Sequence, residues 1–314
     1  MLAVFSKVLV IFILILVGFI ANKKKILPDE ARPHITNLLL YITSPCMIIS
    51  SIYSKELTSS IFLSTVQVMI GAAVFFLVTS IMAYYFVKFL KYKPKADWGM
   101  YIIAITSINS GFMGFPVTKA IFGDDIFYLM VMHNILLTVY IYGFVSPILN
   151  IGGHVKPKLK DIVKSMCNIC MFAVILGFVM LILSIKPPAM IDEIIQLLSD
   201  ATIPISMIVV GMQLGSSDIK SILLNKYLIF TNIASMFIIP VITFLIVNQL
   251  DFLYTDVKVI LIFASAFPTA VAPVAIAEQD GKNAQTLAEA VSLTTFTSLI
   301  TIPLIAGFLM SYYY

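Results

Sequence analysis

Ten apolar stretches run through this sequence, each of about 20 residues and each separated from the next by a short polar segment. About 20 apolar residues are what a helix needs to cross the hydrocarbon core of a bilayer. A membrane-spanning barrel instead has segments of about 10 residues with alternating polarity, and the run at 9–17 does not alternate. We therefore expect ten transmembrane helices near 4–21, 35–53, 61–87, 98–122, 126–150, 166–185, 192–213, 227–249, 257–279 and 285–310.

The composition supports a membrane location. Of the 314 residues, 60% are hydrophobic and 11% are charged, which is too little polar material to cover a soluble globule. The first stretch follows Lys7 and resembles a signal peptide, but no small-x-small cleavage site follows it. The lysines at 23–25 are instead typical of a cytoplasmic anchor, so we keep this stretch as the first helix.

The basic residues predict the orientation. Fifteen of the twenty Lys and Arg residues fall in the loops after helices 1, 3, 5, 7 and 9, and only five fall on the opposite face. Because cytoplasmic loops of membrane proteins carry the excess of positive charge, both termini are expected outside the cytoplasm, in a multi-pass protein of the cell membrane. The net charge of +4 is explained by this topology and does not call for a nucleic-acid partner.

Catalytic and metal-binding patterns are missing. The sequence has no G-x-S-x-G, H-E-x-x-H, Walker A or paired aspartate motif, so we expect neither an enzyme nor an ATP-driven pump. Cys46, Cys167 and Cys170 fall in or beside apolar stretches and are expected to be buried thiols. We predict no disulfide, metal or cofactor.

Two short matches indicate an internal repeat. T-S-P at 43–45 recurs as T-I-P at 202–204, 159 positions later, and P-V at 116–117 recurs at 273–274, 157 positions later. An odd number of helices in each half inserts the second half upside down, which is the inverted repeat of many transporters. We expect five-helix repeats at 1–150 and 166–314, joined by a cytoplasmic linker at 151–165.

Two of the ten stretches break in the middle. The fourth contains N-S-G-F-M-G-F-P at 109–116, and the ninth contains F-P-T-A-V-A-P at 267–273. Backbone outside a helix is tolerated in a bilayer only where it is buried in protein or lines a polar cavity. Paired breaks of this kind in the two halves point to the binding site of a transporter. We expect the helices to restart at Pro116 and Pro273, where the missing N–H costs least.

The two restarted helices would point their N-termini at each other near the bilayer midplane. Each N-terminus carries about half a positive charge, which favours an anion and particularly a carboxylate. Kinked packing helices are the alternative, since Gly and Pro are common in membrane helices. The predicted substrate-binding residues are Asn109, Ser110, Gly111, Gly114, Pro116, His133, Asn134, Pro268, Ala270, Val271 and Pro273.

Other polar residues in the apolar stretches have two interpretations each. His133 could contact substrate or carry a proton, or it could make a hydrogen bond between helices. Lys119, Asp200 and Glu278 could gate the pathway or bind a coupling proton, or their charged groups could extend to the membrane surface. Three more polar residues are predicted to join helices by hydrogen bonds: Gln67, Gln213 and Asn232.

The sequence N-S-G-F-M-G-F-P-V-T-K-A-I-F-G that starts at Asn109 resembles the helix 4 signature of the auxin efflux carrier family, which includes plant carriers and bacterial malate and malonate permeases. The segments 198–201, 268–273 and 39–50 are also similar to that family, so the resemblance spans essentially the whole chain.

The resemblance implies a ten-helix fold of the sodium/proton-antiporter and bile-acid-symporter type, in which helices 4 and 9 are broken and cross. It implies a scaffold of helices 1, 2, 6 and 7, a homodimer formed through helices 2 and 7, and a mobile transport domain of helices 3–5 and 8–10. It assigns Asn109 to the substrate carboxylate and Pro116 and Pro273 to the crossover.

The expected function is therefore elevator-type transport of a small organic anion. The short linker and the lysine-rich composition look bacterial, and Cys170 stands where plant carriers are expected to have Asn. Both differences favour a metabolic acid such as malate or malonate over an auxin-like acid. A sodium/proton antiporter or sodium-coupled symporter of related fold is the alternative, although antiporters typically need an acidic residue at the crossover and neither break contains one. A sensor or scaffold without transport activity is a third possibility.

Overall fold

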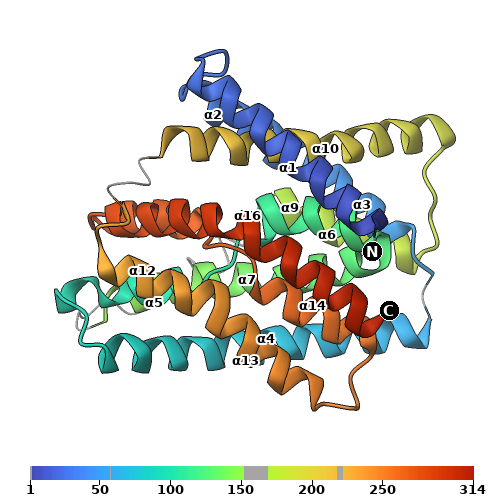
Figure 1. Cartoon of the computed structure of the whole chain (residues 1–314). Coiled ribbons are helices and arrows are strands. Elements are labelled where there is room, and N and C mark those ends of the chain that lie inside the picture. Colours follow the sequence, from blue (N-terminus) through green and yellow to red (C-terminus); the bar gives the residue numbers. More distant parts are fainter. Residues whose placement is uncertain (1, 57, 152–168, 218–221) are drawn as a thin grey trace. The chain divides into compact units, whose positions relative to one another are not determined.

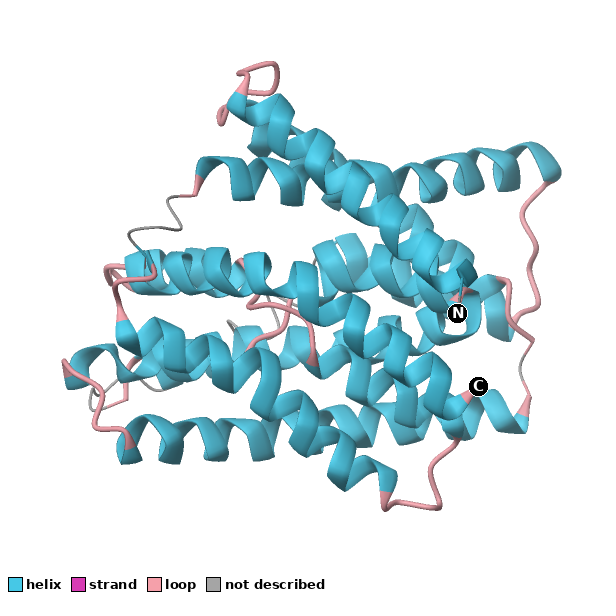
Figure 2. Cartoon of the chain, in the orientation of Figure 1, coloured by secondary structure: helices cyan, strands magenta, loops and turns pink. Residues whose placement is uncertain are grey.

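The computed structural model describes residues 2–56, 58–151, 169–217 and 222–314, and within them the chain is helical (Figure 2). Helical segments lie at each of the ten predicted stretches (Figure 1). The elements are α1 (Leu2–Lys23), α2 (Ala31–Leu38), η1 (Leu39–Thr43), α3 (Ser44–Tyr53), α4 (Ser59–Phe89), η2 (Lys95–Asp97), α5 (Trp98–Thr106), η3 (Ser110–Gly114), α6 (Phe115–Phe122), α7 (Asp124–Leu149), α9 (Ile169–Ile182), α10 (Ala189–Ser216), α12 (Lys226–Ile233), η4 (Ala234–Ile238), α13 (Ile239–Asn248), α14 (Thr255–Ser265), α15 (Ala272–Gln279) and α16 (Gln285–Tyr313).

Six helical stretches of the described residues are long and apolar enough to cross a membrane. They are Ala31–Tyr53, Ser59–Phe89, Asp124–Leu149, Ala189–Ser216, Lys226–Asn248 and Gln285–Tyr313. Shorter apolar helices lie at Leu9–Lys23 and Ile169–Ile182. The number of crossings and the inverted repeat stay predictions. The predicted linker at 151–165 lies, beyond Ile151, outside the described residues, as does Cys167.

Three helical stretches contain a π-helical turn immediately before a proline. The turns η1, η3 and η4 end two residues before Pro45, Pro116 and Pro240, respectively. A proline inside a helix has no N–H for the carbonyl one turn earlier and its ring crowds that carbonyl. Widening the preceding turn to π geometry relieves this crowding, which explains the three positions.

The chain forms two compact units, each built from segments that are distant in sequence. The first unit comprises Met1–Val66, Gly111–Met132 and Cys167–Ser217, and the second comprises Gln67–Ser110, His133–Met166 and Asp218–Tyr314. The first unit contains the helices expected for the scaffold, together with the start of α4, most of η3, α6 and the start of α7. The division into scaffold and transport domain stays a prediction.

In the first unit, α1 packs directly on α10 (Figure 1). The contact relies on glycine: a Cβ at Gly211 would lie 2.0 Å from the carbonyl oxygen of Ile15, and one at Gly18 would lie 2.2 Å from that of Ile208. Small residues allow this close approach of helix backbones in membranes. The two glycines of the G-x-x-x-G pattern that begins at Gly211 therefore contact residues of α1 in the same chain.

In the second unit, α5 and α14 form the interior. All of α5 except Trp98 is buried, and α14 is buried and almost entirely apolar from Val259 to Ser265, as expected of helices surrounded by other helices. These are the two helices that end at the predicted breaks.

Candidate functional site

The two interrupted helices of the second unit are joined where they break. Residues 107–109 follow α5 and residues 266–271 follow α14, and both segments are outside helices. The Asn109 N–H donates to the carbonyl oxygen of Pro268 at 2.7 Å, and the Ala270 N–H donates to that of Ser107 at 2.9 Å. Ile108 and Thr269 thereby form an antiparallel bridge. Backbone N–H and C=O groups that have no partner within their own helix thus bond to each other. Such groups need a partner because a nonpolar environment offers no water to replace it. We call these two segments the crossover.

Threonine side chains hold the crossover in place. Thr269 Oγ1 donates to the carbonyl oxygen of Ala104 at 2.6 Å, near the end of α5. The Thr269 N–H donates to Thr294 Oγ1 of α16 at 3.0 Å. On the opposite side, the Thr106 hydroxyl lies 2.6 Å from that of Tyr140 of α7. Sequence reasoning missed Thr269, Thr294 and Tyr140, although the position of Thr269 in the second break could have marked it.

The predicted extent of the first break is wrong. Only Asn109 of the predicted 109–116 segment lies outside helical structure, because η3 begins at Ser110 and leads directly into α6. The reason is that Pro116 is accommodated by the π-helical turn and needs no unwound segment before it. The second break agrees with the prediction within one or two residues. Pro273 lies in the first turn of α15, so the restart predicted there is confirmed. The restart predicted at Pro116 is wrong, because helical structure already resumes at Ser110.

Two of the predicted binding residues are linked next to the crossover. Ser110 Oγ donates to Asn134 Oδ1 of α7. Asn109, the neighbour of Ser110, is only 6% exposed. This places amide and hydroxyl groups beside the break without a charged side chain in 104–110 or 265–273.

His133 is fully buried in the second unit. Its ring packs against Phe76 and Phe75 of α4, with centroids 5.5 and 6.2 Å apart. Neither Nδ1 nor Nε2 has a hydrogen-bond partner among the described residues. Buried polar groups normally have one, so this imidazole needs an explanation that packing alone does not supply.

The remaining predicted residues fall in both units. Pro268, Ala270 and Pro273 are buried in the second unit, and Val271 is exposed there. Three predicted residues belong to the first unit: Gly111, Gly114 and Pro116.

Lys119 is the centre of a polar group in the first unit. Its Nζ lies 3.1 Å from Ser199 Oγ, 3.8 Å from Asp124 Oδ1 and 3.9 Å from Asp200 Oδ1. The Lys119 side chain is 16% exposed, whereas the two carboxylates are largely exposed. Lys119 thus connects α6 to α10. Glu278, the third predicted gating residue, is exposed on α15 of the second unit.

Asn232 joins two helices, as predicted. Its Nδ2 donates to Thr297 Oγ1 of α16 at 2.9 Å. Cys46 and Cys170 are free thiols. In the part of the chain that the structure describes, no three His, Cys, Asp or Glu side chains gather as metal ligands.

Comparison with known proteins gives a family. The family model described as membrane transport protein matches residues 3–158 and 153–306. An uncharacterized transporter of Methanocaldococcus jannaschii is 25% identical over 310 residues, which cover 95% of this chain and 96% of the relative. An uncharacterized transporter of Methanothermobacter thermautotrophicus is 22% identical over 299 residues, which cover 95% of each chain.

The matched family is one of membrane transporters and not of enzymes. Together with the long apolar helices, the match indicates a multi-pass membrane protein. The chain belongs to the auxin efflux carrier family of membrane transport proteins.

Proposed function

We propose that the protein is a secondary active transporter that moves a small organic anion, a mono- or dicarboxylate such as malate, malonate or an auxin-like acid, across the cell membrane. The single observation that carries this proposal is the crossover. There the backbones of Asn109 and Pro268 are hydrogen-bonded to each other in the interior of the second unit. Interrupted helices in the interior of a membrane protein are typical of substrate sites in secondary transporters.

The chemistry of the crossover favours an anion held without a fixed charge. Helix α15 begins at Ala272, directly after the second break, so its N-terminal partial positive charge is directed at the crossover. Asn109, Ser110 and Asn134 add neutral donors and acceptors beside it. A site built from dipoles and amides binds a carboxylate without holding it so tightly that release becomes slow. His133, buried with both ring nitrogens unpaired, is the candidate for a substrate contact or a proton carrier.

The mechanism that we propose is elevator-type alternating access. In this proposal the chain has ten transmembrane helices in two inverted repeats. Helices 1, 2, 6 and 7 form the scaffold, and helices 3–5 and 8–10 form the mobile transport domain. Both termini lie outside the cytoplasm. Two copies of the chain would associate through helices 2 and 7. The interrupted helices and the membership of a family of membrane transporters support this mechanism.

Sodium/proton antiport is the second candidate, and the absence of an acidic residue from both breaks argues against it. Sodium-coupled symport of the organic anion remains compatible with the same site. Antiport and symport are distinguished by whether the sodium flux needs the organic anion.

The test is uptake of labelled malate, malonate and indole-3-acetate by the purified chain in liposomes, across pH and with or without sodium. Asn109→Ala should reduce uptake at least tenfold, about 1.4 kcal/mol of lost interaction, because the substrate loses a polar partner. Asn232→Ala is the matched control, since it removes a half-buried asparagine of the second unit that bonds to Thr297 and does not belong to the crossover. Normal uptake by Asn109→Ala would exclude Asn109 from the site. Sodium-dependent pH changes without any organic anion would favour the antiporter.

A further inference from the structure

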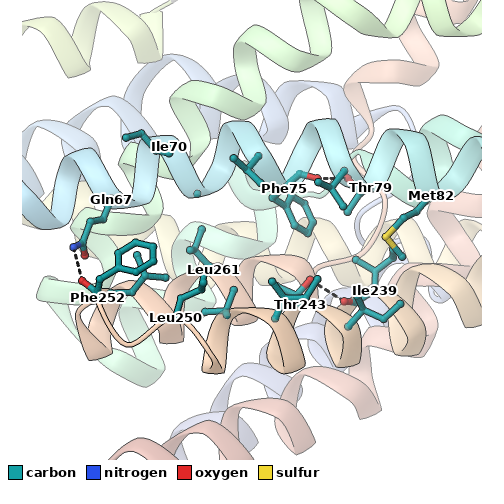
Figure 3. A pocket seen from close by; sticks show the side chains of 17 residues that line it. Gln67, Ile70, Phe75, Thr79, Met82, Ile239, Thr243, Leu250, Phe252 and Leu261 are labelled. Atoms are coloured by element: carbon teal, nitrogen blue, oxygen red, sulfur yellow. Dashed lines mark hydrogen bonds between the residues drawn. The ribbon is translucent and has the colours of Figure 1, made fainter.

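An apolar groove lies between α4 and α13 in the second unit (Figure 3). Its volume is about 260 Å³. An apolar cavity of about 150 Å³ is enough to hold benzene, so this groove has room for a chain of several methylene groups. It is not part of the crossover, whose residues do not line it.

The few polar groups of the groove already have partners. Thr79 Oγ1 donates to the carbonyl oxygen of Phe75 at 2.6 Å, and Thr243 Oγ1 donates to that of Ile239 at 2.8 Å. Gln67, the remaining polar lining residue, is engaged at one end of the groove. No lining residue carries a charge. A carboxylate would therefore lose its hydration without gaining a partner, whereas a hydrocarbon loses nothing.

The groove has a fixed shape. At one end, Gln67 Nε2 donates to the carbonyl oxygen of Phe252 at 2.9 Å and Gln67 Oε1 accepts from the Tyr254 N–H at 3.1 Å, which ties the loop before α14 to α4 (Figure 3). Along the floor, the Leu261 side chain of α14 packs on Gly71 of α4, where an added Cβ would lie 2.6 Å from Leu261 Cδ1.

The groove opens sideways onto apolar surface. Ile70 and Val74 of α4 and Ile246 of α13 are each more than half exposed. Both helices lie in stretches that are long and apolar enough to span the membrane. In the bilayer, the molecules next to such a surface are the acyl chains of lipids.

We propose that this groove binds one acyl chain of a membrane lipid, which lies along α4 and α13 and packs against Val74, Phe75 and Ile246. The chemistry of the lining selects the hydrocarbon part of the lipid. Dispersion contacts with α4 and α13 hold the acyl chain in place, and the side chains that line the groove make these contacts only when the groove is filled.

The experiment uses the full chain in liposomes of phosphatidylethanolamine and phosphatidylglycerol that contain a phosphatidylcholine with a diazirine in the middle of one acyl chain. After illumination, mass spectrometry of peptides should locate the crosslinks on residues that line the groove. Val74→Trp should fill the groove and reduce crosslinking to α13 roughly fivefold, equivalent to about 1 kcal/mol. Leu77→Trp is the matched control, because Leu77 is 64% exposed on the same helix but does not line the groove.

Ile246→Trp fills the groove from the opposite wall and should reduce crosslinking to α4, which keeps the test valid if one variant does not fold. Crosslinks spread evenly over exposed α4 residues, or equal effects of Val74→Trp and Leu77→Trp, would overturn the proposal. Loss of crosslinking on addition of malate would assign the groove to the substrate instead and would also overturn it. Because the readout is labelling and not flux, the result is independent of the proposed transport activity.

Discussion

The Asn109 N–H donates a 2.7 Å hydrogen bond to the carbonyl oxygen of Pro268, and this bond joins the two broken helices of the second unit. Pro268 has no N–H of its own, so it contributes to the pairing only as an acceptor. The bond uses the backbone N–H of Asn109, so it does not depend on which side chain stands at this position. Side-chain substitutions at Asn109 are therefore expected to preserve the crossover, which makes them useful for separating binding from folding.

Thr269→Val should destabilise the protein through the crossover. The substitution removes the hydrogen bond from Thr269 Oγ1 to the Ala104 carbonyl oxygen and leaves a buried acceptor without it, at a cost of about 1–3 kcal/mol. The measurement is thermal unfolding of the purified protein in detergent. Thr243→Val is the control, since that hydroxyl bonds to its own helix at a site away from the crossover and its loss should change stability by less than about 0.5 kcal/mol. Equal effects of the two variants would show that Thr269 has no special role.

Local features of the sequence predicted much of this arrangement. Apolar length placed the helical stretches, and Pro273 placed the first turn of α15. The end of the first break could not be predicted, because no local pattern showed that a π-helical turn would accommodate Pro116. The hydrogen bond from Asn109 to Pro268 could not be predicted either, because Pro268 is far away in the sequence. For the same reason the partners of Thr269 were missed, since no local pattern indicates that α5 and α16 lie beside it.

His133→Leu should leave stability unchanged within about 1 kcal/mol, because the buried imidazole has no hydrogen bond to lose and leucine restores an apolar contact with Phe75 and Phe76. Uptake should nevertheless fall at least tenfold, about 1.4 kcal/mol, if the imidazole meets substrate or carries a proton. Thermal unfolding and liposome uptake are measured on the same preparation. His34→Leu, on the exposed side of α2, is the control. Full uptake by His133→Leu would make His133 a packing residue.

Gly211→Ala should destabilise the first unit, because the added Cβ would lie 2.0 Å from the Ile15 carbonyl oxygen and would force α1 away from α10. Overpacking of this kind typically costs about 1–3 kcal/mol. Gly307→Ala is the control on α16, since no atom lies within 4 Å of its added Cβ. There alanine should stabilise the helix by about 0.5–1 kcal/mol. Opposite shifts of the unfolding temperature are the expected result, and a stabilising Gly211→Ala would contradict the close contact.

The ion pair of Lys119 and Asp200 should contribute little to stability. Its atoms are 3.9 Å apart and Asp200 is 73% exposed, so water screens the attraction. A double-mutant cycle with Lys119→Met and Asp200→Asn should give a coupling energy below about 0.5 kcal/mol. A second cycle, with Lys119→Met and Asp192→Asn, serves as the reference. Asp192 lies on the same helix as Asp200 but contacts Tyr53 and not Lys119. A gating role would appear as altered uptake by Asp200→Asn at unchanged stability, and unaltered uptake would remove that role.

Tyr92 should make the protein sensitive to alkaline pH. Tyr92 lies in the loop between α4 and η2, where burial raises the pKa of its hydroxyl to about 12, and the hydroxyl donates to the Tyr227 carbonyl oxygen at 3.1 Å. An unfolded tyrosine ionises near pH 10. Between pH 10 and 12 the unfolded chain therefore loses this proton more readily than the folded one, and stability falls as pH rises through that window.

Tyr92→Phe tests this dependence. The variant should be less stable by about 1 kcal/mol at neutral pH, because it lacks the hydrogen bond. From pH 10 to 12 it should lose less stability than the natural protein, so the two unfolding temperatures converge, since phenylalanine has no proton to release. Trp98 is the single tryptophan, and its Nε1 donates to the Tyr92 carbonyl oxygen at 2.8 Å, so its fluorescence reports unfolding at this loop. Tyr85→Phe, at an exposed position of α4, should run parallel to the natural protein at every pH. A constant difference between Tyr92→Phe and the natural protein up to pH 12 would mean that the Tyr92 hydroxyl is accessible to solvent in the folded state.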